Sequence, residues 1–282
     1  MKEFKDKVVV ITGGASGIGL GLARKAAKEG MKVVLADVEQ GALDAAEKEI
    51  KATGAQTLAV RTDVSKSSEV EALAKKTLDV FGGVHLVFNN AGVMGGGSIW
   101  RSSEKDWEWI MGVNLWGVIN GVHTFVPIML EQGTEAHVIN TSSTAGLTTG
   151  PTTAIYAVTK HAVVALTEVL YHQLLSRNSL VGASVLCPSS VNTNFVDSDR
   201  NRPAELRDAA AEQFAASSPK QQAQLEASRA SLRQATHPDK VADIVFDAIK
   251  VERFYILTEP ESIIPAVKKR MENILNERNP GS

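Results

Sequence analysis

The chain has 282 residues, of which 44% are hydrophobic and 22% charged, a composition typical of globular proteins. This length allows one large α/β domain or two small ones. With 30 Lys and Arg against 32 Asp and Glu, the net charge of -2 excludes a strong field for attracting nucleic acid or an anionic membrane. No apolar run approaches the ~18 residues that span a bilayer. A single cysteine, Cys187, excludes an internal disulfide and fits a reducing compartment. We expect a cytoplasmic protein.

Short β-branched runs alternate with longer amphipathic stretches along most of the chain. The runs are nearly continuous in apolar residues, as is typical of parallel strands covered on both faces. They predict strands at Lys7–Thr12, Lys32–Ala36, Gln56–Arg61, Val84–Asn89, Ala136–Thr141, Val181–Leu186 and Phe254–Leu257. The stretches predict helices near Ile18–Glu29, Gly41–Ala52, Ser67–Phe81 (with Ser65 marking its start), Asp106–Gln132, Ile155–Ser176, Pro238–Lys250 and Ser262–Glu277. This alternation predicts an α/β fold, a Rossmann-type doubly wound parallel sheet of about seven strands flanked by helices, in a single domain.

The segment Val196–Thr236 departs from this alternation. It is polar and rich in Ala, Gln and Ser, with apolar residues only at Leu206, Phe214, Leu225 and Leu232. It predicts one or two helices inserted after the sixth strand. Because ligands bind beyond the carboxyl ends of such strands, the insertion is expected to form a lid over a substrate site. An ordinary surface hairpin of helices is the alternative.

The first strand leads directly into a glycine-rich turn, Thr12–Gly19 (TGGASGIG), and a helix follows. Glycines let the backbone approach a pyrophosphate closely, and the helix start offers unpaired N–H groups to that anion. A tight turn needs glycine with or without a ligand, so the turn gains weight from the strand before it and the helix after it. The candidate cofactor contacts in this turn are Gly13, Ser16, Gly17, Ile18 and Gly19.

Asp37 closes the second predicted strand, near the spacing of ~20 residues expected for the acid that binds the ribose hydroxyls. A carboxylate there accepts hydrogen bonds from a 2′-hydroxyl and repels a 2′-phosphate. No basic residue lies between Gly13 and Gly19 or directly after Asp37. The sequence therefore favours NAD over NADP. An exposed acid that caps the next helix is the alternative.

Tyr156 and Lys160 lie one helical turn apart on the predicted helix that begins near Ile155, and so share a face. A tyrosine has an ordinary pKa of ~10, and a neighbouring ammonium favours its phenolate. Ser143 follows the strand that ends at Thr141, where its hydroxyl can hold a substrate oxygen beside Tyr156. Together with the glycine turn, this set predicts acid–base chemistry next to a dinucleotide.

These motifs together resemble the short-chain dehydrogenase/reductase family over nearly the whole chain. The matching residues are Thr12–Gly19, Asp63-Val64, Asn89–Gly92 (NNAG), Asn114, Ser142-Ser143 with Gly146, and Tyr156 with Lys160. The resemblance implies that Tyr156 is the general acid/base and that Ser143 orients and polarises the carbonyl. It implies that Lys160 binds the nicotinamide ribose and lowers the pKa of the tyrosine. Asn114 would hold a water in a proton relay, and Ser142 would support the strand end.

The resemblance also implies further cofactor contacts. Asp63 would meet the adenine edge with Val64 alongside it, and the residues that line the cofactor and steady the sheet would be Asn90, Ala91 and Gly92. After the sixth strand such proteins usually have Pro-Gly, whereas this chain has Pro188-Ser189. That departure puts the local backbone path in doubt and adds a polar group near the nicotinamide. The positions that still match contacts to the ring and its carboxamide are Pro188, Val191 and Thr193.

The sequence thus predicts an NAD-dependent oxidoreductase that moves a hydride between the cofactor and a secondary alcohol or ketone. An NAD-binding sensor or scaffold without turnover, and a lyase or epimerase that retains NAD, are the alternatives. The resemblance implies a homotetramer or dimer, with the helices of Asn114 and Tyr156 in the main interface. No metal-ligand spacing is present. The sequence does not name the substrate; the candidate apolar pocket residues are Met94, Trp100, Leu147, Ile155 and Phe195.

Overall fold

The computed structural model describes residues 1–95, 98–151, 154–207 and 219–281. Its sheet has seven parallel strands in the order β3-β2-β1-β4-β5-β6-β7. The strands are β1 (Val8–Thr12), β2 (Lys32–Asp37), β3 (Thr57–Arg61), β4 (Leu86–Asn89), β5 (Ala136–Thr141), β6 (Val181–Cys187) and β7 (Tyr255–Leu257). The strand order reverses between β1 and β4, which is the switch point of a doubly wound sheet. The predicted fold class is confirmed.

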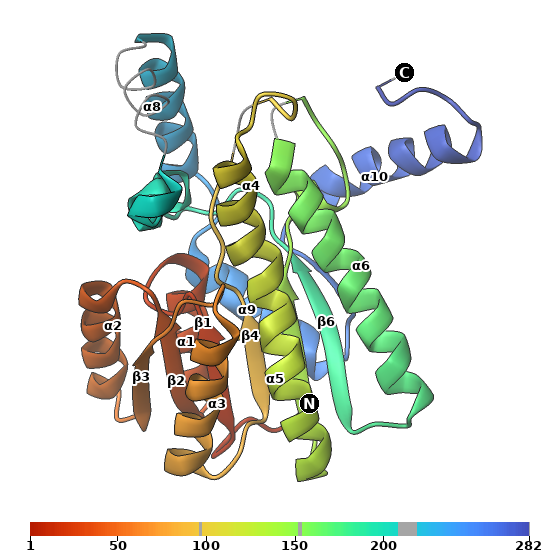
Figure 1. The fold of residues 1–282 in the computed structure, drawn as a ribbon. Helices are drawn as coiled ribbons and strands as arrows, with labels where there is room; N and C mark the ends of the chain where they lie inside the picture. The colour runs from red at the N-terminus through yellow and green to blue at the C-terminus, as the bar shows by residue number, and fades with distance from the viewer. Residues whose placement is uncertain (96–97, 152–153, 208–218, 282) are drawn as a thin grey trace.

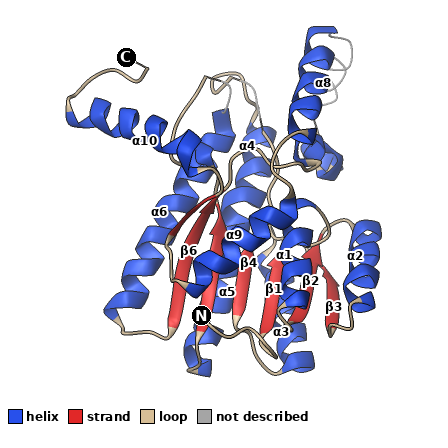
Figure 2. Cartoon of the chain, turned by 180° about the vertical axis from the view of Figure 1, so that it is seen from behind, coloured by secondary structure: helices blue, strands red, loops and turns tan. Residues whose placement is uncertain are grey.

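Helices cover both faces of the sheet (Figures 1 and 2). One face packs against α1 (Gly17–Lys28), α2 (Gln40–Ala52) and α9 (Pro238–Lys250), and the other against α3 (Ser67–Phe81), α5 (Gly117–Gln132) and α6 (Ala154–Ser176). Strand β1 shows why its first four residues, Val8 to Ile11, are all apolar. Val9 and Ile11 enter the first core, while Val8 and Val10 enter the second. Alternate side chains point to opposite faces, so a strand covered on both sides needs apolar residues at every position.

One predicted helix is divided in the structure, and one predicted helix-start residue is wrong although the helix itself, Ser67–Phe81, is confirmed. The single helix expected at Asp106–Gln132 is α4 (Glu104–Met111), a π-helical segment η1 (Gly112–Trp116) and α5 in succession. A π turn is wider than an α turn, and π turns inside α-helices are common at functional sites. At α3, Ser65 does not mark the helix start: Lys66 is the N-cap, and the Ser65 hydroxyl instead donates to the Asp63 carboxylate at 2.7 Å.

The continuous helical stretch Glu104–Gln132 has the length and mean hydropathy, 1.3, that a membrane span needs. Its buried side chains are explained by contacts inside this molecule. Phe125, Val126 and Met129 belong to the second core, together with residues of α3 and the sheet. The stretch is therefore a core helix of the fold.

The segment after β6 contains short 3₁₀ turns before a longer helix. The 3₁₀ turns are η3 (Phe195–Asn201) and η4 (Ala204–Leu206), and the helix is α8 (Pro219–Arg233). Helix α8 projects from the rest of the molecule at the carboxyl edge of the sheet (Figure 1). The expected helical insertion is thus confirmed for its described part, although its first third is 3₁₀ rather than α-helical. Phe214 lies outside the described residues. The chain ends in α10 (Pro260–Leu275).

His137 on β5 is fully buried, and its Nε2 lies 2.8 Å from the Ser184 hydroxyl, which donates to the Arg253 carbonyl. Burial lowers the pKa of His137 to about 3. Between that value and the ~6.5 of an unfolded histidine, the unfolded chain binds more protons. We expect the free energy of unfolding to fall by up to ~1.4 kcal/mol per pH unit as the pH drops below 6.5.

Urea unfolding of wild type and His137→Gln between pH 4.5 and 7.5 measures this contribution. The variant keeps a donor toward Ser184 and is expected to have a shallower pH slope than wild type. His123→Gln, at an exposed site on α5, is the matched control and should keep the wild-type slope. Equal slopes in wild type and His137→Gln would contradict the prediction.

Candidate functional site

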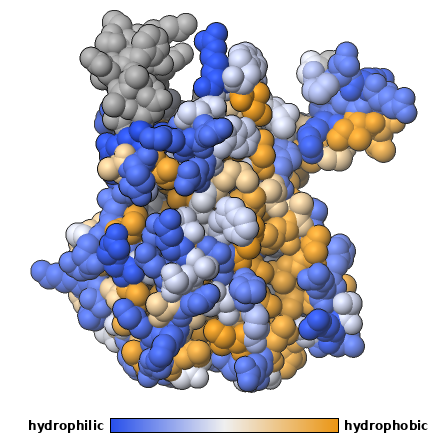
Figure 3. All heavy atoms as spheres, viewed as in Figure 1, coloured by the Kyte–Doolittle hydropathy of each residue, from blue (hydrophilic) through white to orange (hydrophobic). Residues whose placement is uncertain are grey.

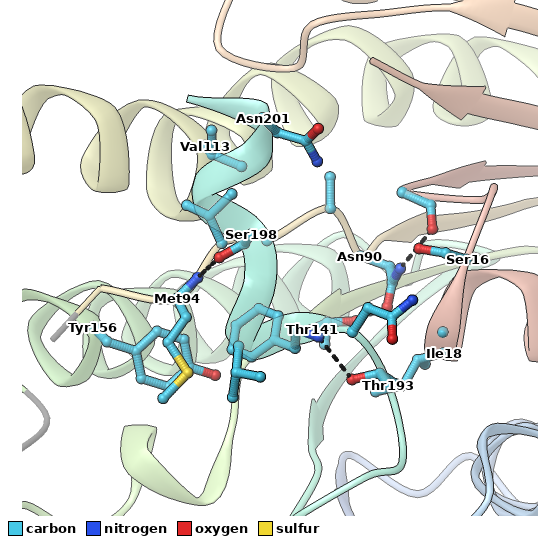
Figure 4. Close-up of a pocket in the computed structure, with 18 of the residues that line it drawn as sticks. Ser16, Ile18, Asn90, Met94, Val113, Thr141, Tyr156, Thr193, Ser198 and Asn201 are labelled. Atoms are coloured by element: carbon cyan, nitrogen blue, oxygen red, sulfur yellow. Dashed lines mark hydrogen bonds between the residues drawn. The ribbon is translucent and has the colours of Figure 1, made fainter. Parts of the chain in front are cut away.

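A cavity of about 1130 Å³ opens at the carboxyl edge of the sheet and takes lining residues from the loops after six strands, β1 to β6 (Figure 4). This is the crevice in which doubly wound sheets bind ligands. The predicted cofactor residues Gly13, Ser16, Gly17, Ile18, Asp37, Asp63, Val64, Asn90, Ala91, Gly92, Pro188, Val191 and Thr193 all line it. So do Ser143, Tyr156 and Lys160. The predicted residues Gly19 and Asn114 do not line the cavity.

The glycine turn is held close to the loop after β4. The Thr12 hydroxyl accepts from the backbone N–H groups of Asn90 and Ala91 at 2.9 and 3.1 Å, and Asn90 Nδ2 donates to the Thr12 carbonyl at 3.0 Å. A Cβ on Gly13 would come within 2.9 Å of Ala91 Cα. This close approach, with φ of 63° at Gly13, requires glycine.

The first turn of α1 is open toward the cavity. Ser16 is its N-cap but makes no side-chain capping hydrogen bond. A Cβ on Gly19 would overlap the carbonyl oxygen of Gly13, so only glycine lets the turn fold back on itself here. The N–H groups of a first turn have no partner inside their helix. Together with the positive end of the helix dipole, they form an anion site.

Asp37 joins the glycine turn to the start of α2. Its carboxylate accepts from the backbone N–H of Ala15 and of Glu39, both at 3.1 Å. Burial raises the pKa of Asp37, while these hydrogen bonds act to lower it. The N-cap of α2 is Glu39, so Asp37 is not the cap of that helix. Its position beside both the turn and the cavity is the one expected of a ribose-binding acid.

Lys160 and Tyr156 project from the first turns of α6 into the far end of the cavity. The Lys160 ammonium is 2% exposed and donates to the Thr141 carbonyl at 2.9 Å, and its Nζ lies 5.6 Å from the centroid of the Tyr156 ring. The Ser142 hydroxyl donates to the Lys160 carbonyl at 2.7 Å, which ties the end of β5 to α6. Ser143 is the N-cap of the short 3₁₀ turn η2 (Thr144–Gly146) and accepts from Ala145 N–H.

Asn114 lies in the π-helical segment and is completely buried. Its Oδ1 accepts from the Val93 N–H at 2.8 Å, and its Nδ2 donates to the Val93 carbonyl at 2.9 Å. A weaker contact reaches the Thr159 hydroxyl at 3.4 Å. The side-chain amide thus fixes the loop after β4 against α6, beside Lys160.

The expected lowering of the tyrosine pKa is not found. Burial raises the pKa of Tyr156 to about 12, and the interaction with the Ser143 side chain only offsets part of that rise. Burial also lowers the pKa of Lys160 to about 8, so the ammonium itself is less firmly charged than an exposed lysine. Helical spacing puts the two groups on one face, but it does not say that the same burial penalises both charged forms.

Two of the five candidate substrate residues line the cavity. Met94 does so, and Phe195 packs edge-on against the Tyr156 ring with centroids 5.7 Å apart. Trp100, Leu147 and Ile155 do not line it. Trp100 is 81% exposed, Leu147 packs toward Val164 and Cys187, and Ile155 is buried with Trp109 and Val93. Position after a strand end indicates the correct loop but not the direction of a side chain.

Sequence reasoning missed the residues that connect η3 to the cavity. The Ser198 hydroxyl accepts from the Met94 N–H at 2.7 Å, and Arg200 and Asn201 contact Glu39. All of these residues line the cavity. Glu39 lies only two positions after Asp37, but its partners lie about 160 positions away in the chain, so no local pattern points to them.

Comparison with known proteins agrees with this geometry. Residues 7–204 match the short chain dehydrogenase family. A CLA biosynthesis dehydrogenase/reductase of Lactiplantibacillus plantarum is 35% identical over 283 aligned residues, covering 99% of this chain and 97% of that one. A C alpha-dehydrogenase of a Sphingobium species is 32% identical, covering 99% and 89%. A short chain dehydrogenase/reductase from Burkholderia phymatum, solved in complex with NAD, superimposes with a TM-score of 0.94 at 47% identity, covering 100% and 99%.

The chain belongs to the short-chain dehydrogenase/reductase family of oxidoreductases, and its fold is that of the family.

Proposed function

We propose that this chain is an NAD-dependent dehydrogenase that transfers a hydride between the nicotinamide and a secondary alcohol or ketone. One observation carries the proposal. A single cavity holds an open helix N-terminus and Asp37 at one end and the Ser143, Tyr156 and Lys160 side chains at the other. A dinucleotide needs both ends, because its phosphates and its reactive ring lie far apart in the molecule.

The residues present fit NAD. The glycine turn folds tightly because a Cβ at Gly13 or Gly19 would meet neighbouring protein atoms. The helix N-terminus that follows it lines the cavity and suits a pyrophosphate, and the Asp37 carboxylate suits two ribose hydroxyls. The NAD-bound relative from Burkholderia phymatum supports the same choice. When bound, NAD supplies the hydride acceptor or donor, which no amino-acid side chain can supply.

In this mechanism Tyr156 holds the proton that the substrate oxygen gains or loses, while Ser143 hydrogen-bonds the same oxygen and orients it. Lys160 holds the cofactor ribose and places positive charge near the phenol. Asn114 positions Lys160 by fixing the loop after β4 against α6, and would hold the relay water implied by the family pattern. Because burial raises the pKa of Tyr156 to about 12, the phenol is protonated at neutral pH. That form donates a proton to a ketone, so alcohol oxidation is expected to accelerate as pH rises.

The substrate site lies against apolar side chains. Met94, Phe195 and Val196 line the cavity, and Phe195 packs against the Tyr156 ring. An apolar wall with one polar clamp, made by Ser143 and Tyr156, suits a secondary alcohol on a largely apolar body. A sensor without turnover and a lyase or epimerase that retains NAD are the competing functions, and both would bind NADH without net conversion of an alcohol.

Assembly and location belong to the same proposal. We infer a single domain, with 196–236 as its lid, in a cytoplasmic homotetramer or dimer. Apolar side chains gather over α5 and α6, where Figure 3 shows a continuous hydrophobic area. Val169 on α6 is more than half exposed, and so is Trp116 at the end of η1, directly before α5. Helices that carry such residues are expected to pack against a second copy.

The test is formation of NADH at 340 nm over a panel of secondary alcohols, with NAD and NADP run in parallel. The proposal predicts turnover with NAD on at least one bulky, apolar member of the panel. Tight NADH binding without net turnover on the panel, together with exchange or elimination chemistry, would favour the competing functions.

Asp37→Asn is expected to lower kcat/KM for NAD by roughly 10- to 100-fold, because the amide replaces an acceptor that serves two ribose hydroxyls. It removes the charge that repels a 2′-phosphate, so the NAD-to-NADP ratio of kcat/KM falls as well. Steady-state kinetics with both cofactors measures the ratio. An unchanged ratio would show that Asp37 does not choose the cofactor. Asp44→Asn, an exposed acid further along α2, is the control.

A further inference from the structure

Two segments far apart in the sequence are joined at the rim of the cavity. Arg200 donates to the Glu39 carboxylate through Nη2 at 2.6 Å and Nε at 3.3 Å, and Asn201 Nδ2 donates to it at 2.8 Å. These contacts lower the pKa of Glu39, so it is charged at neutral pH. Two oxygens meeting two guanidinium N–H groups is the bidentate arrangement that gives a carboxylate–arginine pair its specificity.

The junction is tied to the ribose-binding acid. Glu39 N–H donates to the Asp37 carboxylate at 3.1 Å, so the same loop that carries Asp37 also holds Arg200. Arg200 also donates through Nη1 to the carbonyls of Asn194 and Asp197. These hydrogen bonds hold the backbone at the start of η3 against the Arg200 side chain. A change at Glu39 is therefore transmitted both to the cofactor end of the cavity and to the path of η3.

Segment η3 is attached on both sides of the cavity. At one end Arg200 and Asn201 meet Glu39, in the middle the Ser198 hydroxyl binds the Met94 backbone (Figure 4), and at the other end Phe195 packs against the Tyr156 ring. Phe195, Ser198 and Asn201 all face the cavity. The segment thus lies over the space between the ribose end and the catalytic end.

We propose that Glu39 and Arg200 form a latch that closes η3 over the bound dinucleotide and sets how fast the cofactor leaves. The inference rests on the proposed function, because the occupant of this cavity is taken to be NAD. With the latch closed, a dinucleotide bound at Asp37 and Tyr156 lies beneath η3. Release requires the Glu39–Arg200 pair to part first.

The exposure of the pair gives the latch a measurable property. The Arg200 and Glu39 side chains are 38% and 30% exposed, so solvent and salt reach them. Such a pair contributes modestly and is screened by added salt. The latch is therefore expected to slow release by about fivefold at low ionic strength, and by less at high ionic strength.

The experiment is stopped-flow measurement of NADH release from the full chain, followed by the fluorescence of the bound cofactor. Arg200→Met and Glu39→Gln are each expected to raise the dissociation rate constant about fivefold. The double variant should release NADH no faster than Arg200→Met, since both substitutions remove the Glu39–Arg200 pair and Arg200→Met also removes the hydrogen bonds to the Asn194 and Asp197 carbonyls. Arg200→Lys should fall between wild type and Arg200→Met. The wild-type rate should rise with salt, and the rates of the latch variants should not.

Asp79→Asn is the matched control, because it removes an exposed Lys75–Asp79 pair on α3. It should leave the release rate and its salt dependence as in wild type. Effects of the two latch substitutions that multiply in the double variant would overturn the latch, and so would an unchanged rate in Glu39→Gln. If wild type bound no NADH, the proposed function itself would fail and the latch with it. Wild-type binding with no change among the variants would overturn the latch alone.

Discussion

Tyr156→Phe is expected to lower kcat by about 10³-fold while leaving the affinity for NADH nearly unchanged. The substitution removes the phenol hydroxyl, which interacts with the Ser143 side chain and belongs to the ring that lies 5.6 Å from Lys160 Nζ. The ring remains, so its edge contact with Phe195 and the cavity wall persist. The loss should therefore appear in the chemical step rather than in cofactor binding.

The measurement pairs steady-state rates on the best panel alcohol with a fluorescence titration of NADH. Tyr171→Phe, on the same helix but outside the cavity lining, is the control and should retain wild-type rates. A Tyr156→Phe enzyme that keeps more than about a tenth of the wild-type kcat would remove the tyrosine from the proton transfer. Equal loss of turnover and NADH affinity would point to a structural role instead.

Gly19→Ala has the second large expected effect. A Cβ at this position would overlap the Gly13 carbonyl and come within 2.9 Å of Asn90 Nδ2, so both the turn and its anchor to the loop after β4 have to move. Forced repacking of this kind costs about 1–3 kcal/mol. Because the displaced groups form the pyrophosphate site, we expect NADH to bind roughly 10- to 100-fold more weakly.

Gly41→Ala provides a matched control, since nothing lies within 4 Å of its Cβ position on α2. It should leave NADH affinity unchanged and stabilise the helix by up to about 1 kcal/mol. Titration of NADH fluorescence, together with thermal unfolding, separates loss of the site from loss of the fold. Wild-type affinity in Gly19→Ala would mean that the turn does not hold the cofactor phosphates.

The fold was predictable because its pattern is local. Strand β1 is apolar from Val8 to Ile11, the glycine turn follows it directly, and Asp37 stands at the end of β2. Each such signal reports on its immediate neighbours, so the order of strands and helices follows from the chain. The π-helical segment at Asn114 was not predictable, because an α-helix and a π turn share the same apolar pattern.

Properties that depend on distant residues were not predictable. The partners of Glu39 come from a polar segment with no periodic pattern, so the latch could not be inferred from either half alone. The direction of the Tyr156 pKa shift depends on how deeply α6 is buried, which spacing does not reveal. Likewise, Trp100 and Ile155 lie close in sequence to loops of the site, but the Trp100 side chain faces solvent and the Ile155 side chain is buried in the core.

The central claim is that the cavity transfers a hydride directly between substrate carbon and nicotinamide. The most direct measurement uses the best panel alcohol with deuterium on its carbinol carbon and follows the label in NADH by mass spectrometry. We expect one deuterium on the nicotinamide ring for each ketone formed, and label transfer about 10³-fold slower in Tyr156→Phe. Product formed without label in the recovered cofactor would contradict direct hydride transfer, and with it the proposed function.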